Sequence, residues 1–113
     1  MFRQSPEIGD IILLNFVPQS GNEIQKRRPA LVISCTFFNE TTGFSVVCPI
    51  TSTQNSFPLH ISLDSRTTTH GDILIEQLKS LDYNARSWSF LEKAPNDILD
   101  RAIDLAKNYI IGK

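Results

Sequence analysis

The chain of 113 residues has the usual length of one domain, about 100–150 residues. Hydrophobic residues make up 41% of it and charged residues 20%, and the formal net charge is −1. This balance excludes a disordered chain and a protein that coats nucleic acid through a strongly basic surface. Its apolar runs are far shorter than the roughly 20 residues that span a membrane, and residues 1–10 lack the apolar stretch of a signal peptide. We therefore expect one cytoplasmic domain over residues 1–113, in which any nucleic-acid site is a local patch.

Five to six short strands are predicted from runs of β-branched and aromatic residues and from alternation of apolar and polar ones. They cover residues 11–16, 30–38, 44–50, 57–63 and 71–78, with a short sixth at 88–91. Residues 18–27 are expected to form a long loop and residues 52–56 a polar loop. Residues 39–43 are expected to form a hairpin turn in which Gly43 takes a positive φ.

The apolar period changes near the C-terminus. Apolar side chains recur there at three- and four-residue spacing, at Leu99, Ala102, Ile103, Ala106 and Ile110. Pro95 suits a first helical position, Asn96 is a candidate cap and Gly112 ends the helix. The chain thus predicts a mainly β fold, a small antiparallel barrel or strongly bent sheet with one C-terminal helix, and the short strands favour the barrel.

The most informative stretch is basic. Three consecutive cations, Lys26, Arg27 and Arg28, precede Pro29, and no acidic residue occurs between Glu23 and Glu40. Proline restricts the residue before it to extended conformations. A guanidinium held in this way at the start of a strand can bind a phosphate through two parallel hydrogen bonds. A solvated basic loop explains the same residues equally well.

Two further polar stretches follow predicted strands. Residues 48–55 place Thr51 and Ser52 where a buried strand ends, and a hydroxyl there can donate to a phosphate or position a 2′-hydroxyl. Ordinary turn chemistry is the favoured alternative for this stretch. Residues 76–82 are polar after an apolar strand, which also suits an edge strand protected by charge. Phe16 and Phe57 lie beside polar loops, where an aromatic ring can stack on a base.

The remaining chemically notable residues have structural interpretations. His60 and His70 have no evident partner in the sequence, so a catalytic role is not favoured for either. Cys35 and Cys48 are expected to be buried small hydrophobes that face each other across the hairpin, since two cysteines are too few for a disulfide scaffold and no zinc-ligand spacing occurs. Trp88 is expected to anchor the core or a dimer interface.

In their order and spacing, these stretches resemble the MazF/PemK family of toxin endoribonucleases from bacterial toxin–antitoxin systems. The motifs that carry the resemblance are Gly9-Asp10-Ile11-Ile12 with Asn15-Phe16 and Pro18, Gly21-Asn22-Glu23, Arg28-Pro29-Ala30-Leu31, Cys48-Pro49-Ile50-Thr51-Ser52, Phe57-Pro58, and residues 76–82 with Ala85-Arg86. The resemblance implies an SH3-like barrel of the CcdB/MazF/Kid type that acts as a homodimer. It also implies a cognate antitoxin partner and cleavage of single-stranded RNA with no metal and no cofactor. The products would carry 2′,3′-cyclic phosphate and 5′-hydroxyl ends.

The resemblance also assigns roles to residues. In the MazF-like branch an arginine before the proline and a threonine at the end of the third strand carry the reaction, and these are Arg28 and Thr51 here. Glu23 would be a base or a brace that orients Arg28. The Kid/PemK-type set would fall on Asn22, Leu74 and Glu76, which do not match it. The residues expected to contact RNA are Phe16, Pro18, Gln19, Asn22, Lys26, Arg27, Ser52, Phe57, Gln77, Lys79 and Ser80.

Two alternatives stay open at this stage. The same fold family includes CcdB-like proteins that bind gyrase and cut no RNA, and fold does not fix function. Their action depends on a tryptophan close to the C-terminus, whereas residues 108–113 contain none. An inactive family member kept for regulation is the second alternative. The loop at residues 22–26 departs from the family pattern, so the RNA sequence that is recognised does not follow from the resemblance.

Overall fold

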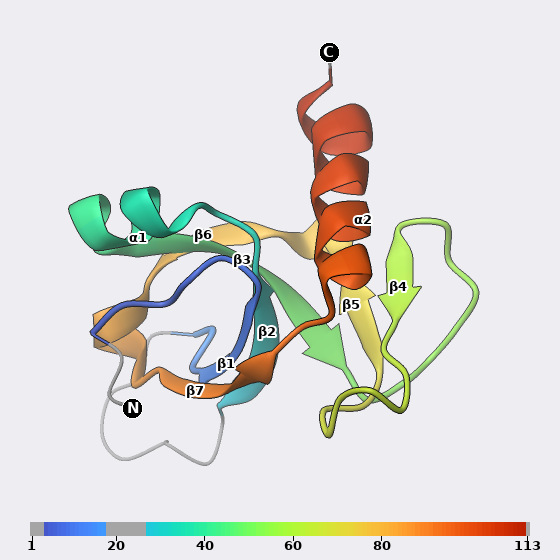
Figure 1. Cartoon of the computed structure of the whole chain (residues 1–113), viewed down its shortest axis with the longest axis horizontal. Coiled ribbons are helices and arrows are strands. Elements are labelled where there is room, and N and C mark those ends of the chain that lie inside the picture. The colour runs from blue at the N-terminus through green and yellow to red at the C-terminus, as the bar shows by residue number, and fades with distance from the viewer. Residues whose placement is uncertain (1–3, 18–26, 113) are drawn as a thin grey trace.

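A computed structural model describes residues 4–17 and 27–112 (Figure 1). Its strands are β1 (Asp10–Leu14), β2 (Arg28–Val32), β3 (Phe44–Thr51), β4 (His60–Ser62), β5 (Asp72–Leu74), β6 (Lys79–Asp82) and β7 (Ser89–Lys93). Its helices are α1 (Thr36–Thr42), α2 (Asn96–Ala106) with a π-helical extension η4 (Lys107–Ile111), and the 3₁₀ turns η2 (Ile75–Gln77) and η3 (Tyr83–Arg86). Within these described residues, no helix is long and apolar enough to cross a membrane.

The strands form one antiparallel sheet of seven in the order β4-β5-β3-β2-β1-β7, and β6 pairs with β3 beside that path. β3 is the central strand, because its first half pairs with β6 and its last two residues pair with β5. The predicted mainly β fold with a C-terminal helix is confirmed. The described residues form seven strands rather than five or six, and the sheet is strongly bent and open, with β4 and β7 as its ends.

Each face of the sheet buries its own apolar cluster, since alternate residues of a strand point to opposite faces. Ile11, Leu31 and Cys48 belong to the cluster that packs under α2, which stands upright beside β3 and β5 in Figure 1. Residues Ile12 and Ala30 belong to the second cluster, on the opposite face. The strands β1 and β2 are therefore buried on both sides, which explains their nearly continuous apolar sequence.

Trp88 packs against the second cluster, with its ring 5.7 Å from that of Tyr83 at an interplanar angle of 78°. The edge-to-face arrangement is a favoured geometry for two aromatic rings. This contact confirms the interpretation of Trp88 as a core residue.

One helix was not predicted. The second strand ends at Val32, and residues 36–42, expected as strand and hairpin turn, form α1. Asn39 is fully buried in this helix, where its side-chain amide donates to the carbonyl of Pro6 (2.9 Å) and its own carbonyl accepts the hydroxyl of Tyr83 (2.7 Å). These long-range bonds outweigh the local strand preference of the aromatic residues. Gly43 does take a positive φ, 76°, but it caps α1.

Other predicted boundaries also need correction. The expected strand at residues 71–78 is interrupted after Leu74 by η2, and the chain then forms β6. The helix α2 begins at Asn96, and its N-cap is Pro95, not Asn96 as predicted, so the helix has no side-chain cap. Cys48 is buried as expected, but it lies opposite Leu31, and Cys35 is exposed just before α1. The two cysteines therefore do not face each other across a hairpin.

Candidate functional site

Arg28 and Thr51 lie at the same end of two neighbouring strands. β2 and β3 are antiparallel, and their register ends with Ala30 opposite Pro49; Arg28 lies two residues before Ala30 and Thr51 two residues after Pro49. Since residues two apart on a strand point to the same face, Arg28 and Thr51 share the face of the Ala30–Pro49 pair. Arg28 is exposed and forms no hydrogen bond or ion pair with the described part of the chain. Thr51 is half-buried, and its hydroxyl oxygen accepts the amide of Thr53 at 3.4 Å.

The same cross-strand row continues into the far part of the sheet. Thr51 is paired with Asp72 on β5, and Asp72 is paired with Ser62 on β4. Ile73, the residue next to Asp72, points into the cluster under α2. The polar row therefore lies on the face opposite that cluster. Thr51, Asp72 and Ser62 follow one another across β3, β5 and β4, and Arg28 lies at the adjacent end of β2.

Asp72 is fully buried, and each of its carboxylate oxygens accepts a hydrogen bond. The hydroxyl of Ser62 donates to Oδ1 at 2.7 Å, and the backbone amide of Asn55 donates to Oδ2 at 3.1 Å. Hydrogen bonds of this kind offset the free-energy cost of burying a carboxylate away from water. Asp72 thus ties the segment after Thr51 back onto β5.

His60 adjoins this carboxylate. Its Nε2 lies 3.0 Å from Oε2 of Glu76, and its Nδ1 lies 3.0 Å from Oδ1 of Asn55 and 3.7 Å from Oδ2 of Asp72. Sequence reasoning found no partner for His60 because its partners are 5 to 16 residues away in the chain. The available signal was the strand alternation, which puts His60 on the polar face of β4 together with Ser62.

Two of the residues expected to contact RNA meet beside the row. The ammonium of Lys79 lies 5.7 Å from the ring centroid of Phe16. Lys79 is paired with Val47 on β3, so it shares the face of Thr51. The guanidinium of Arg86 donates to the carbonyls of Asn15 and Phe16, which holds the Phe16 backbone in place.

Two other expected RNA contacts, Arg27 and Ser80, are not brought to this row. The guanidinium of Arg27 donates to the carbonyl of Ser87 at 3.0 Å and to the hydroxyl of Ser89 at 3.4 Å, so it is engaged at β7. Ser80 follows Lys79 directly and therefore points to the opposite face of β6. Ser52, Phe57 and Gln77 are exposed. The residues expected at the site that lie outside the described part of the chain are Pro18, Gln19, Asn22, Glu23 and Lys26.

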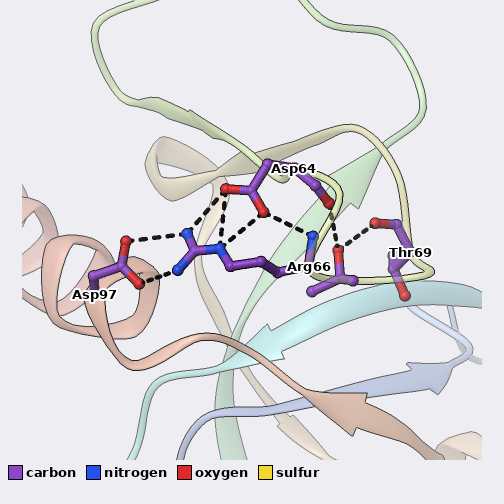
Figure 2. Close-up of polar contacts among 5 residues, drawn as sticks. Asp64, Arg66, Thr69 and Asp97 are labelled. Carbon is purple, nitrogen blue, oxygen red and sulfur yellow. Dashed lines mark hydrogen bonds and ion pairs between the residues drawn. The ribbon is translucent and has the colours of Figure 1, made fainter.

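The loop that leads into β5 is anchored at two points. Figure 2 shows Arg66 between Asp64 of the loop and Asp97 of α2, with nitrogen–oxygen distances of 2.9 and 2.8 Å. Hydrogen bonds from Arg66 lower the pKa of both carboxyl groups. At the second point, the Glu92 carboxylate accepts the backbone amides and hydroxyls of Thr68 and Thr69. The loop is thereby fixed to α2 and to β7, and with it the start of β5.

No group of three or more His, Cys, Asp or Glu side chains that could hold a metal ion occurs in residues 4–17 and 27–112. The site instead offers an exposed guanidinium, a hydroxyl, an ammonium beside an aromatic ring, and a buried carboxylate bonded to a serine. These groups suit the binding of a phosphate together with an unpaired base.

Comparison with known proteins identifies the family. The model of PemK-like, MazF-like toxins of type II toxin–antitoxin systems matches residues 7–106. The chain belongs to this family. The endoribonuclease toxin ChpB of Escherichia coli (strain K12) is 36% identical over 105 residues, which cover 86% of this chain and 87% of that protein. The endoribonuclease toxin MazF of the same strain is 33% identical over 84 residues, 74% of this chain and 75% of that protein.

Solved structures agree. A MazE-MazF crystal structure from Deinococcus radiodurans (Form-III) has a TM-score of 0.85 and 32% identity, and the match covers 96% of this chain and 98% of that one. The family, the fold and the class of endoribonuclease toxin expected from the sequence are confirmed. The alternative of a CcdB-like gyrase-binding protein is not favoured by these relatives.

Proposed function

We propose that the chain is a sequence-selective, metal-independent endoribonuclease. It cleaves single-stranded RNA, and Arg28 and Thr51 are its catalytic residues. The observation that carries this proposal is that Arg28 and Thr51 lie at the same end of β2 and β3, where the Arg28 guanidinium is exposed and has no hydrogen bond or ion pair with the described residues. Family membership supports the reaction class. The roles given to Arg28 and Thr51 are those that the family resemblance implies, and they suit the chemistry of RNA cleavage.

RNA carries its own nucleophile, the 2′-hydroxyl, so the reaction calls for no metal-activated water. The 2′-oxygen loses its proton and bonds to the adjacent phosphorus, and the bond from phosphorus to the 5′-oxygen breaks. The leaving oxygen takes up a proton, which leaves a 2′,3′-cyclic phosphate and a 5′-hydroxyl. Negative charge accumulates on the phosphoryl oxygens as the bonds exchange.

Arg28 would bind those oxygens through its planar guanidinium, which stabilises the charge that develops in the transition state. Thr51 would hold the phosphate or orient the 2′-hydroxyl from the adjacent strand. Glu23 would act as a base or as a brace for Arg28. Phe16 and Lys79 would receive the flanking nucleotide, the ring by stacking and the ammonium by its charge.

The remaining RNA contacts proposed from the family resemblance are Pro18, Gln19, Asn22, Lys26, Arg27, Ser52, Phe57, Gln77 and Ser80. Since the loop at residues 22–26 differs from the family pattern, we propose that these residues set which RNA sequence is cut. The substrate class is single-stranded, because base edges must be free for hydrogen bonding.

We further propose that the protein works as a homodimer in the bacterial cytoplasm and is neutralised by an antitoxin with an acidic tail. Support for a dimer comes from exposed apolar side chains on η4, where Tyr109 is 71% and Ile111 78% exposed. Support for an antitoxin comes from the MazE-MazF complexes among the similar structures. Sedimentation of the isolated chain and of the chain expressed with its neighbouring gene product would test both statements.

The test of the main proposal is cleavage of a long unstructured RNA in the presence of EDTA, with the product ends mapped. We expect discrete cuts with cyclic phosphate ends, and at least about a hundredfold slower cleavage by Arg28→Ala. The matched control is Arg101→Ala, which removes an exposed arginine from α2 and should cut like wild type. Cleavage by Arg28→Ala within a few-fold of wild type would contradict the assignment, and cleavage that EDTA abolishes would contradict metal independence.

A further inference from the structure

Arg86, the last residue of η3, is bonded to the backbone of the segment that leaves β1. Its guanidinium donates from Nη1 to the carbonyl oxygen of Asn15, at 3.4 Å, and to that of Phe16. Its own carbonyl accepts the backbone amide of Asn15 at 2.9 Å. From Nε it also donates to Oδ1 of Asp82 at 2.9 Å, and the side chain is only 14% exposed. A largely buried arginine thus holds two consecutive residues that lie 71 and 70 positions earlier in the chain.

The residues after Arg86 connect the same corner of the fold to the start of β2. The carbonyl of Ser87 accepts the guanidinium of Arg27 at 3.0 Å, and the hydroxyl of Ser89 accepts it at 3.4 Å. Ser87 has a φ of 54° and a ψ of 48°, the left-handed conformation that residues other than glycine seldom adopt. Such a conformation persists where the surrounding contacts hold it. The corner formed by Arg86, Ser87 and Ser89 therefore fixes both the segment after β1 and the residue before β2.

Phe16 is the residue of this segment that lies in the proposed RNA site. Its ring packs against the second apolar cluster and lies 5.7 Å from the ammonium of Lys79. Arg28 is opposite Leu14, a member of that cluster, so Phe16 and Arg28 lie on the same face of the sheet. Base stacking and cation–π contact act over only a few ångströms, so both depend on where the ring is held.

We propose that Arg86 is a positioning residue for RNA binding: its hydrogen bonds to the carbonyls of Asn15 and Phe16 set the Phe16 ring beside Lys79, where a nucleotide next to the cleaved bond stacks. The inference rests on the proposed function, because it concerns the support of that RNA contact. Arg86 acts through the backbone of its neighbours and not on a phosphate, since its guanidinium is bonded to two carbonyls and to Asp82.

The Arg28 side of the site is held by a different bond of the same corner. Arg27 is bonded to the backbone carbonyl of Ser87, and a substitution of the Arg86 side chain leaves that carbonyl in the chain. Loss of the Arg86 guanidinium should therefore weaken RNA binding much more than it slows the chemical step at Arg28.

The test is a double-mutant cycle on RNA binding. The probe is a short RNA with the mapped cleavage site and a 2′-deoxyribose at the cleaved nucleotide, which lacks the nucleophile and stays intact. We expect Arg86→Gln and Phe16→Leu each to raise the Kd about tenfold, the loss of one stacked base. The double variant should also raise it about tenfold rather than a hundredfold, because both changes remove the same contact. Single-turnover cleavage at saturating RNA should slow by less than about threefold in Arg86→Gln.

The salt dependence of the Kd separates positioning from direct contact with a phosphate. Loss of one phosphate contact to a single strand reduces the slope of log Kd against log salt concentration by about 0.7, whereas Arg86→Gln should keep the wild-type slope. The matched control is Arg101→Gln, the same change at an exposed arginine of α2, which should bind like wild type. Thermal unfolding verifies that each variant is folded. If Arg86→Gln unfolds, Arg86→Lys, which keeps a donor for one carbonyl, replaces it in the cycle.

Additive losses in the double variant, or a reduced salt slope on substitution of Arg86, would overturn the inference while RNA cleavage stands. Either result would indicate that Arg86 itself contacts RNA. Wild-type protein that neither binds nor cuts the RNA would instead overturn the proposed function, and the inference with it.

Discussion

Gly71 lies directly against the backbone of Thr51. A Cβ atom on residue 71 would stand 1.7 Å from the carbonyl oxygen of Thr51, and the φ of Gly71 is +120°. Both facts require glycine, since no L side chain fits that distance and few adopt that φ. The carbonyl of Gly71 accepts the amide of Leu63 at 2.8 Å, so the glycine is held on its other side as well. The end of β3, where Thr51 lies, is thereby set by a residue 20 positions further along the chain.

Substitution of Gly71 should therefore be severe. We expect Gly71→Ala to lower the free energy of unfolding by about 3 kcal/mol or more, because backbone must move to accept the methyl group. Urea denaturation followed by circular dichroism measures this loss. Gly43→Ala is the matched control: its φ is also positive, 76°, but nothing lies within 4 Å of the added Cβ. It should cost only about 1–2 kcal/mol, the strain of the left-handed conformation. Equal losses in the two variants would contradict the role given to the Thr51 contact.

The role of the Thr51 hydroxyl can be separated from that of its shape. Thr51→Val keeps the branched side chain and removes the hydroxyl, whereas Thr51→Ser keeps the hydroxyl. We expect cleavage by the valine variant to fall about a hundredfold, mostly in kcat, with cleavage by the serine variant within about tenfold of wild type. Single-turnover rates on the mapped RNA provide the measurement. Equal activity of the valine and serine variants would show that the hydroxyl takes no part in the reaction.

Much of the fold was predictable because local pattern and tertiary structure agree in most elements. The strands β1 and β3 and the helix α2 follow from residues whose apolar period matches their burial. The helix α1 was not predictable in this way. Its sequence Thr-Phe-Phe favours a strand, and what makes it a helix is the buried Asn39, whose partners Pro6 and Tyr83 are 33 and 44 residues away.

The candidate site, like the fold, could be predicted from the sequence only in part. Arg28 and Thr51 could be chosen from motif order, and the register that the structure adds brings them to one face. His60 could not be assigned partners, since Glu76 belongs to η2, a turn that the sequence pattern did not separate from the preceding strand. Pro29 distinguishes Arg28 from Arg27 in the sequence, whereas the contacts of Arg27 with Ser87 and Ser89 are seen only in the structure.

Glu92 should make stability depend on pH. Burial alone would raise the pKa of this carboxyl, but the hydrogen bonds from Thr69 and Thr68 outweigh it and lower the pKa. A lowered folded-state pKa stabilises the fold above the unfolded value, about 4.3 for glutamate, and this contribution is lost as the pH falls through the folded value. Glu92→Gln should therefore lose about 1 kcal/mol at pH 7 and show a smaller further loss on acidification.

Urea denaturation at pH 7 and at pH 3 distinguishes these contributions. The comparison variant is Asp100→Asn, which removes one negative charge from the exposed surface of α2. It should leave the free energy of unfolding at pH 7 within about 0.5 kcal/mol of wild type. If Glu92→Gln and Asp100→Asn behave alike at both pH values, the anchoring of residues 68 and 69 by Glu92 contributes nothing to stability.

The two cysteines should differ sharply in reactivity. Burial first, and then the negative charge of Glu76, raise the pKa of the Cys48 thiol to about 12, so almost no thiolate forms at pH 8. Cys35 is exposed at the start of α1. Iodoacetamide at pH 8 should therefore add one group to the native protein, at Cys35, and two to the urea-unfolded protein, as mass spectrometry of the peptides will show. Cys35→Ser should give no adduct in the native state.

Since Cys48 is paired with Leu31 in the centre of the sheet, its slow labelling requires opening of the fold, and Gly71→Ala should accelerate it. Rapid labelling of Cys48 in native wild-type protein would contradict its place in the core.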